Sequence, residues 1–134
     1  TRRRKLKMLD TQAEAAIRAA AEGYCLALHN ADADFLENLC HDRYFMTSMQ
    51  PDGTELFFDK ESFVARCRAR DPFEGEPSYE ILSIDFEPEM ASVKLWVDME
   101  PRRYCDYLGF MKVGDDWKLI TKLFRTAKGP AVGA

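Results

Sequence analysis

Residues Tyr79 to Arg125 read YEILSIDFEPEMASVKLWVDMEPRRYCDYLGFMKVGDDWKLITKLFR. Apolar and polar residues alternate along this stretch, and Pro, Gly or paired acids interrupt it, which predicts four long strands joined by short turns. Strands joined in series in this way form an antiparallel meander. This second half of the chain therefore decides the fold.

The later strands of the meander carry apolar residues on both faces. Between residues 92 and 99 the apolar residues keep to alternate positions, whereas between 104 and 113, and again between 117 and 124, they occupy both parities. An antiparallel sheet that packs on one face only should alternate cleanly, so the second apolar face needs a cover. Helices can cover one face. We expect a second copy of the chain to cover the other, giving a homodimer through the sheet.

Three helices are expected in the first half of the chain, at residues 11–31, 32–41 and 59–70. Thr11 and Glu14 form the pattern of a capping box at the start of the first helix. Asp59 is a preferred capping residue for the third. Between the second and third helices, residues 44–58 predict a hairpin with Gly53 in its turn.

Helices and strands are segregated along the chain, which predicts an α+β fold. We expect three N-terminal helices packed on a curled antiparallel sheet. The 134 residues are enough for one domain. We place that domain at residues 11–126, between a flexible basic arm at 1–10 and a C-terminal tail at 127–134.

Composition argues against several classes of partner. The chain has 19 basic and 23 acidic residues, a formal charge of −4, and no basic stripe beyond its first residues. Nucleic-acid binding is therefore not expected. No apolar run reaches the ~20 residues of a membrane span, and no signal-peptide pattern is present. The sequence thus predicts a cytoplasmic protein with no membrane partner.

The cysteines and histidines are too scattered for a metal site. The four cysteines are Cys25, Cys40, Cys67 and Cys105. They form no C-x-x-C motif and have no histidine at ligand spacing, so we expect buried free thiols, no metal and no cofactor.

Four segments of the meander resemble one family. EILSIDF at 80–86, ASVKL at 91–95, DYLGFMKV at 106–113 and WKLITKLF at 117–124 are similar to the putative lumazine-binding family. That family lies in the nuclear transport factor-like superfamily, with ketosteroid isomerase, scytalone dehydratase and the small polyketide cyclases. The resemblance covers about residues 12–126. It implies a cone-shaped α+β fold, also described as cystatin-like, with a homodimer through the sheet and a cavity between sheet and helices.

Tyr24 is the leading candidate for a site residue. The resemblance places it where ketosteroid isomerases carry the tyrosine that donates to a developing enolate oxygen. The alternative is an aromatic residue of the helical core whose hydroxyl bonds a neighbour. The isomerase base falls by similarity at Ser48 and its oxyanion-hole acid at Gly109, and neither residue type supplies that chemistry. Asp106, at an odd offset from Gly109, should point to the opposite face of its strand.

Two histidines and two aspartates are further candidates for a polar site. His41 is a candidate proton carrier at the cavity rim, or else it bonds the carbonyls at a helix end. His29 is expected to face solvent. Asp98 and Asp106 form either a carboxylate pair across adjacent strands or part of a solvated rim, neutralised by Lys94, Arg102 or Arg103.

A cavity of this fold would be apolar with few polar groups. We expect its lining to include Tyr104, and predict ligand contacts from Tyr24, Met46, Ser48, Phe63, Trp96, Tyr107 and Met111.

Three functions remain open. The first is a homodimeric domain that binds a small aromatic or polycyclic molecule without transforming it. The second is an isomerase, dehydratase or cyclase that uses Tyr24 and His41. The third is a protein-interaction module that offers the apolar face of the sheet to a partner.

Overall fold

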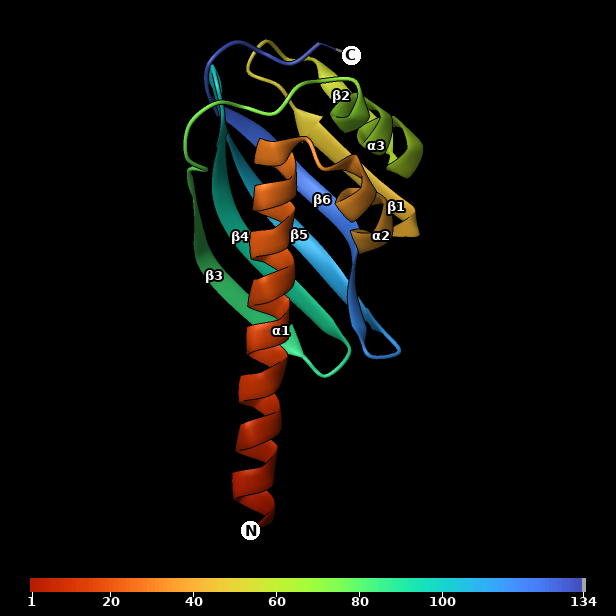
Figure 1. Ribbon diagram of the computed structural model, residues 1–134, viewed down its shortest axis with the longest axis vertical. Coiled ribbons are helices and arrows are strands. Elements are labelled where there is room, and N and C mark those ends of the chain that lie inside the picture. The colour runs from red at the N-terminus through yellow and green to blue at the C-terminus, as the bar shows by residue number, and fades with distance from the viewer. Residues whose placement is uncertain (134) are drawn as a thin grey trace.

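Three helices cover one face of a six-stranded sheet (Figure 1). The computed structural model describes residues 1–133. In chain order the elements are α1 (Arg2–Asn30), α2 (Ala33–Leu39), β1 (Cys40–Met49), β2 (Glu55–Asp59), α3 (Lys60–Arg68), β3 (Tyr79–Glu87), β4 (Met90–Met99), β5 (Arg102–Val113) and β6 (Asp116–Lys128). The α+β class and the expected order of elements are confirmed. Below, the face of the sheet that the helices cover is called the inner face, and the opposite face the outer face.

The sheet is mixed, which corrects the expectation of an antiparallel one. Its strand order is β2-β1-β6-β5-β4-β3, and every neighbouring pair is antiparallel except β1 and β6. After β2, α3 and the following loop carry the chain to the far edge of the sheet. The meander then returns strand by strand, so that β6 arrives beside β1 in the same direction.

Local signals placed the hairpin and the third helix correctly. Gly53 turns the β1–β2 hairpin at φ 87°, in the left-handed region that glycine tolerates best. Asp59 caps α3, its Oδ1 accepting a hydrogen bond of 2.9 Å from the amide of Ser62. These two features confirm the predicted turn and cap.

The first helix begins nine residues before the predicted start at Thr11. Residues Arg2 to Leu9 are arginine, lysine, leucine and methionine, all good helix formers, so nothing ends the helix there. The Thr11 hydroxyl donates back to the carbonyl of Lys7 at 3.0 Å and caps nothing. Residues 1–10 are exposed, and this end of α1 projects beyond the sheet (Figure 1).

The second helix is shorter than expected. It ends at Leu39 rather than near residue 41, and β1 begins at Cys40 rather than at Tyr44. Its Phe35 packs on α1 at Gly23, where the ring occupies the space that a β-carbon would need. The glycine inside α1, unfavourable for helix propensity, therefore permits a close approach of two helices.

The core lies between α1 and the inner face of the sheet. From α1 it takes residues that include Ile17, Ala21, Tyr24 and Leu28, and from the sheet Val93, Leu95, Leu108, Phe110 and Leu119. The outer face is apolar as well. Its exposed large residues include Phe45, Met49, Phe57, Tyr107, Met111 and Leu123, called here the outer apolar face. Within residues 1–133 no helix combines the length and the apolar character that crossing a bilayer requires.

We predict that deleting residues 1–10 leaves the free energy of unfolding nearly unchanged, because every side chain removed is exposed. Deleting residues 1–20 should lower it by at least ~1.5–3 kcal/mol, since Ile17 is completely buried. Urea unfolding followed by circular dichroism measures both. A large loss from the shorter deletion would mean that the exposed turns of α1 are required for the fold.

Candidate functional site

Three polar side chains meet inside the core. The Tyr24 hydroxyl on α1 donates to Asp106 Oδ2 on β5 at 2.5 Å, and Lys122 Nζ on β6 donates to the Tyr24 oxygen at 2.8 Å. Tyr24 is 0% exposed, Asp106 1% and Lys122 6%. Buried polar groups of this kind are stable only when they bond one another. The three residues, called here the Lys122–Tyr24–Asp106 chain, form a continuous hydrogen-bonded path.

The strand parity of β5 explains the place of Asp106. Asp106, Leu108 and Phe110 point to the inner face, whereas Gly109 belongs to the outer face and abuts Thr121. The predicted opposition of Asp106 and Gly109 is thus correct, but the solvated-rim interpretation of Asp106 is wrong. Asp106 keeps the phase of the buried Leu108 and Phe110, and that phase was the signal in the sequence.

Lys122 was not predicted to belong to a site. It lies on the inner face of β6 with Phe124 and Thr126, two and four residues later. An irregularity in the β5–β6 register at Gly109–Phe110 puts Lys122 out of step with the buried Trp117 and Leu119. Beyond the irregularity, the inward positions of β6 are even-numbered instead of odd-numbered. Simple alternation from Trp117 and Leu119 therefore predicts that Lys122 faces outward.

Burial perturbs all three groups. It raises the pKa of Asp106, against the opposing effects of the Lys122 charge and the Tyr24 hydrogen bond. It lowers the pKa of Lys122, against the opposing charge of Asp106. It raises the pKa of Tyr24, and the Asp106 charge adds to that effect. The Tyr24 hydroxyl therefore stays protonated and bonded on both sides.

Aromatic rings surround the lysine. Nζ lies 4.6 Å from the ring centroid of Phe63, 5.1 Å from that of Phe124 and 5.2 Å from that of Tyr24. Ring faces attract an ammonium group, and they do so most strongly where water is excluded. The surroundings that make the charge of Lys122 costly therefore also contain groups that favour it.

Lys122 also lines a cavity of about 400 Å³. The walls come from α3 and the loop after it, from α1, from strands β1, β4, β5 and β6, and from the C-terminal segment. Its apolar lining includes Leu28, Met46, Phe63, Phe73, Met99, Tyr104, Phe124 and Val132, and its charged lining is Arg66, Arg70, Glu100, Arg102 and Lys122. Three residues that the sequence placed in the lining, Met46, Phe63 and Tyr104, are therefore together here.

Three other predicted contacts lie on the outer face instead. Trp96 donates its indole N–H to Glu80 at 3.1 Å and lies under the guanidinium of Arg103. Tyr107 and Met111 are exposed. They are not in the lining of this cavity, because their strand parity, opposite to that of Asp106, turns them away from the helices.

Ser48 is buried but belongs to a separate network. It accepts a hydrogen bond of 2.8 Å from Gln50 Nε2. The Gln50 carbonyl oxygen in turn accepts from the Thr126 hydroxyl at 2.9 Å and from the Val132 amide at 2.8 Å. This network attaches the C-terminal segment to β1, and of its members Val132 alone is among the residues that line the cavity.

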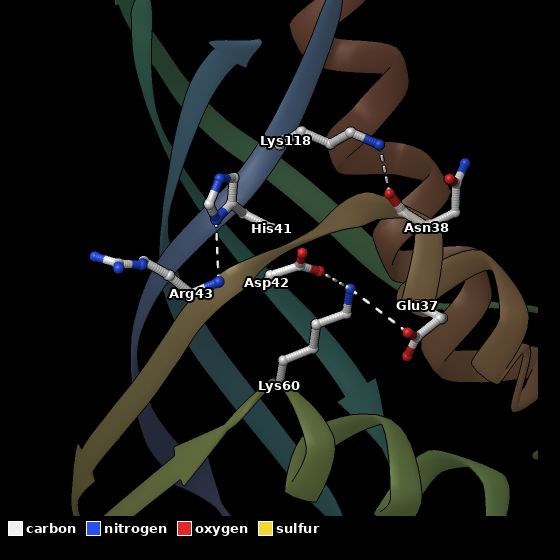
Figure 2. Close-up of polar contacts among 7 residues, drawn as sticks. All are labelled: Glu37, Asn38, His41, Asp42, Arg43, Lys60 and Lys118. Atoms are coloured by element: carbon white, nitrogen blue, oxygen red, sulfur yellow. Dashed lines mark hydrogen bonds and ion pairs between the residues drawn. The ribbon is translucent and has the colours of Figure 1, made fainter.

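His41 lies at the start of β1 in a charged surface cluster (Figure 2). Its Nδ1 accepts a hydrogen bond of 3.0 Å from the Arg43 amide, whereas nearby Lys60 pairs with Glu37 at 3.6 Å and Asp42 at 3.2 Å. His41 is not among the residues that line the cavity. His41 thus bonds the backbone of its own strand, not the carbonyls of the preceding helix.

His29 and Asp98 each make well-defined polar contacts. His29 does not face solvent: it is buried, and its Nε2 lies 2.9 Å from the carbonyl oxygen of Gly75 in the loop after α3. That loop covers a position which helical periodicity alone would expose. Asp98 forms a two-point ion pair with Arg103 at 2.6 and 2.9 Å, so for this residue the neutralised rim is confirmed.

Within the described residues, no group of three or more histidine, cysteine or acidic side chains is arranged to hold a metal. The cysteines are free, and Cys25, Cys40 and Cys67 are buried. Burial raises the pKa of Cys40 to about 12, which keeps that thiol protonated at neutral pH.

The chain matches one family model, described as putative lumazine-binding, over residues 12–125. No curated protein matches it in sequence. Similar solved structures include an NTF2-like protein of unknown function from Silicibacter pomeroyi, with 22% identity and a TM-score of 0.81 over 87% of this chain and 98% of that one. Another, from Shewanella baltica, has 18% identity and a TM-score of 0.80 over 89% and 97%.

A ketosteroid isomerase-like protein from Erwinia carotovora atroseptica is similar at 17% identity, with a TM-score of 0.66 over 86% of this chain and 96% of that one. At these identities the likeness concerns the fold. It confirms the predicted NTF2-like α+β architecture.

We predict that Tyr24→Phe lowers the free energy of unfolding by ~2–4 kcal/mol, because it leaves a buried carboxyl and a buried ammonium each without a partner. Tyr44→Phe is the matched control. Tyr44 is equally buried, but its hydroxyl donates only to the Met46 sulfur, at 3.2 Å, so we expect a loss below ~1 kcal/mol. Equal losses in urea unfolding would contradict a special role for the Lys122–Tyr24–Asp106 chain.

Proposed function

The chain belongs to the putative lumazine-binding family, within the NTF2-like fold, and on that premise we propose that it is a homodimeric domain that binds a small aromatic or polycyclic molecule. The ligand occupies the cavity beside Lys122 and is held there without being transformed. The observation that carries the proposal is the cavity itself.

The size and chemistry of the cavity support this function. Its volume of about 400 Å³ falls within the range of ~300–1,000 Å³ typical of small-molecule sites. Phe63, Phe73, Tyr104 and Phe124 contribute aromatic surface, and the polar groups are few and charged. Such a lining suits a flat apolar ligand with one polar end.

The enzymatic alternative has less support. The Tyr24 hydroxyl already donates to Asp106 and accepts from Lys122, so it has no proton free for a substrate. His41 bonds the Arg43 amide and lies outside the cavity lining. The two residues proposed for isomerase, dehydratase or cyclase chemistry therefore do not converge on one space.

The homodimer is proposed from the outer apolar face. Phe57 is 62% exposed, Met49 60%, Leu123 55% and Tyr107 51%. Apolar side chains gathered on one face of a sheet are typical of an interface. A second copy of the same face is the economical cover, since isologous pairing needs no other protein. The protein-interaction module remains the alternative use of this face.

We predict that a thermal-shift screen of one- to three-ring aromatic compounds yields ligands that stabilise the native protein by ~2.7 kcal/mol at a hundredfold excess over Kd. Ala69→Trp, which places a large ring at the cavity wall, should abolish the shift. Ala65→Trp, one turn earlier within α3 and outside this cavity, is the control and should retain it. A screen without stabilising compounds would overturn the binding function.

We predict a mass of twice 15.4 kDa by light scattering at micromolar concentration. Phe57→Asp should give a monomer, because it places a charge in the outer apolar face. Leu26→Asp, at an exposed apolar position of α1, should remain a dimer. A wild-type monomer would refute the homodimer and favour the interaction module.

A further inference from the structure

We infer that the ligand of this cavity is an anion: an apolar, aromatic molecule that carries one carboxylate, bound against Arg70 and Lys122. This inference rests on the proposed binding function and adds the chemical class of the ligand. It follows from the imbalance of charge in the cavity wall and from hydrogen-bond donors there that the protein leaves without acceptors.

The cavity wall is cationic in a chain that is acidic overall. Arg66, Arg70, Arg102 and Lys122 line it, against the single acid Glu100, although the whole chain has a formal charge of −4. Among residues 1–133 none of these four cations has a carboxylate within ion-pair distance, whereas Arg18, Lys60, Arg68 and Arg103 each do. Within the described residues, then, no direct ion pair neutralises the positive charge of the wall.

Arg70 has a buried donor without a partner. Its Nη2 donates to the carbonyl of Leu28, and its guanidinium lies 4.9 Å from the ring centroid of Phe73. These contacts fix the plane of the group. Nη1 is buried and has no acceptor among the described residues. A buried charged donor without an acceptor is costly, and an anionic group in the cavity that Arg70 lines would offset the cost of that charge.

Lys122 also has N–H donors without acceptors among the described residues. An ammonium carries three N–H groups, and Tyr24 accepts one of them. The side chain is otherwise enclosed by the rings of Phe63 and Phe124 and by the cavity. Asp106 balances its charge only through the intervening Tyr24 hydroxyl. A ligand oxygen would be a direct acceptor for the remaining N–H groups.

The donors and the walls together favour an aromatic carboxylate over other anions. A planar carboxylate matches the fork of a guanidinium, and its single charge suits two donor groups set in apolar walls. A phosphate ester carries up to two charges and needs more donors for its three oxygens. The aromatic surface of Phe63, Phe73 and Phe124 accounts for the rest of the molecule.

The test compares acids with their uncharged isosteres. Benzoate, naphthalene-2-carboxylate and anthracene-2-carboxylate are titrated into the protein at pH 7 by calorimetry, each beside its primary carboxamide. We expect at least one acid to bind about tenfold or more tightly than its amide, because cationic donors bond an ionised carboxylate more strongly than a neutral amide oxygen. Naphthyl phosphate is expected to bind more weakly than the naphthoate.

Two variants locate the effect. Arg70→Gln should reduce the preference for acid over amide to about threefold or less, while the amide still binds. Arg66→Gln, on an exposed side chain over the Phe58 ring, is a second variant that should weaken the preference without removing buried bonds. Arg68→Gln is the matched control: Arg68 pairs with Asp34 at 3.0 Å, lies outside this cavity, and should leave the preference unchanged.

The outcomes separate the inference from the function on which it rests. Equal binding of acids and amides, or tighter binding of the phosphate, overturns the inference and leaves the binding function standing. A preference that Arg70→Gln and Arg66→Gln both leave intact places the anion elsewhere and also overturns it. If neither acids nor amides of any ring size bind, the proposed function fails, and this inference fails with it.

Discussion

The structure depends on how two opposite charges are accommodated in an apolar core. Asp106 and Lys122 are both buried, and neither could stay there alone without a large desolvation penalty. The Tyr24 hydroxyl joins them by accepting from one and donating to the other. These two hydrogen bonds require α1, β5 and β6 to meet at fixed positions. They also place an ammonium group in the wall of the cavity.

The two faces of the sheet carry different groups. The inner face holds the core, the Lys122–Tyr24–Asp106 chain and the cavity. The outer face carries exposed apolar side chains, and none of the three helices covers it (Figure 1). Because α1 to α3 cover the inner face alone, a partner that covers the outer face need not touch the cavity. Ligand binding and self-association can therefore be tested with separate variants.

Much of the fold followed from local patterns in the sequence. The alternation in residues 79–125, the Gly53 turn and the Asp59 cap each predicted an element that the structure contains. The parallel pairing of β1 with β6 could not be predicted this way, because local periodicity carries no information about which distant strands become neighbours. The early start of α1 lies in a segment whose positive charge favours an exposed arm, whereas its residue types favour a helix.

The candidate site was harder to predict than the fold. The resemblance singles out Tyr24, which lies in the Lys122–Tyr24–Asp106 chain and not in the cavity lining. Residue chemistry singles out Met46, Phe63 and Tyr104, which do line the cavity. The sequence places Asp106 at the rim, because a carboxylate is rarely buried without a charged partner nearby. Its partner is Lys122, and the irregular register of β5 and β6 prevents simple alternation from showing that Lys122 faces inward. Trp96, Tyr107 and Met111 were grouped by residue type, although their strand parity separates them from the cavity.

In this structure Tyr24 and Asp106 hold Lys122 as an ammonium group in the cavity wall. Nitrogen-detected NMR of the lysine side chains measures this most directly, with Lys122→Met used to assign the signal. We expect the Lys122 resonance to be that of an ammonium at pH 7, and to lose its proton at a lower pH than the exposed lysines, because burial lowers its pKa. A neutral Lys122 amine at pH 7 would contradict a charged lysine in the cavity wall.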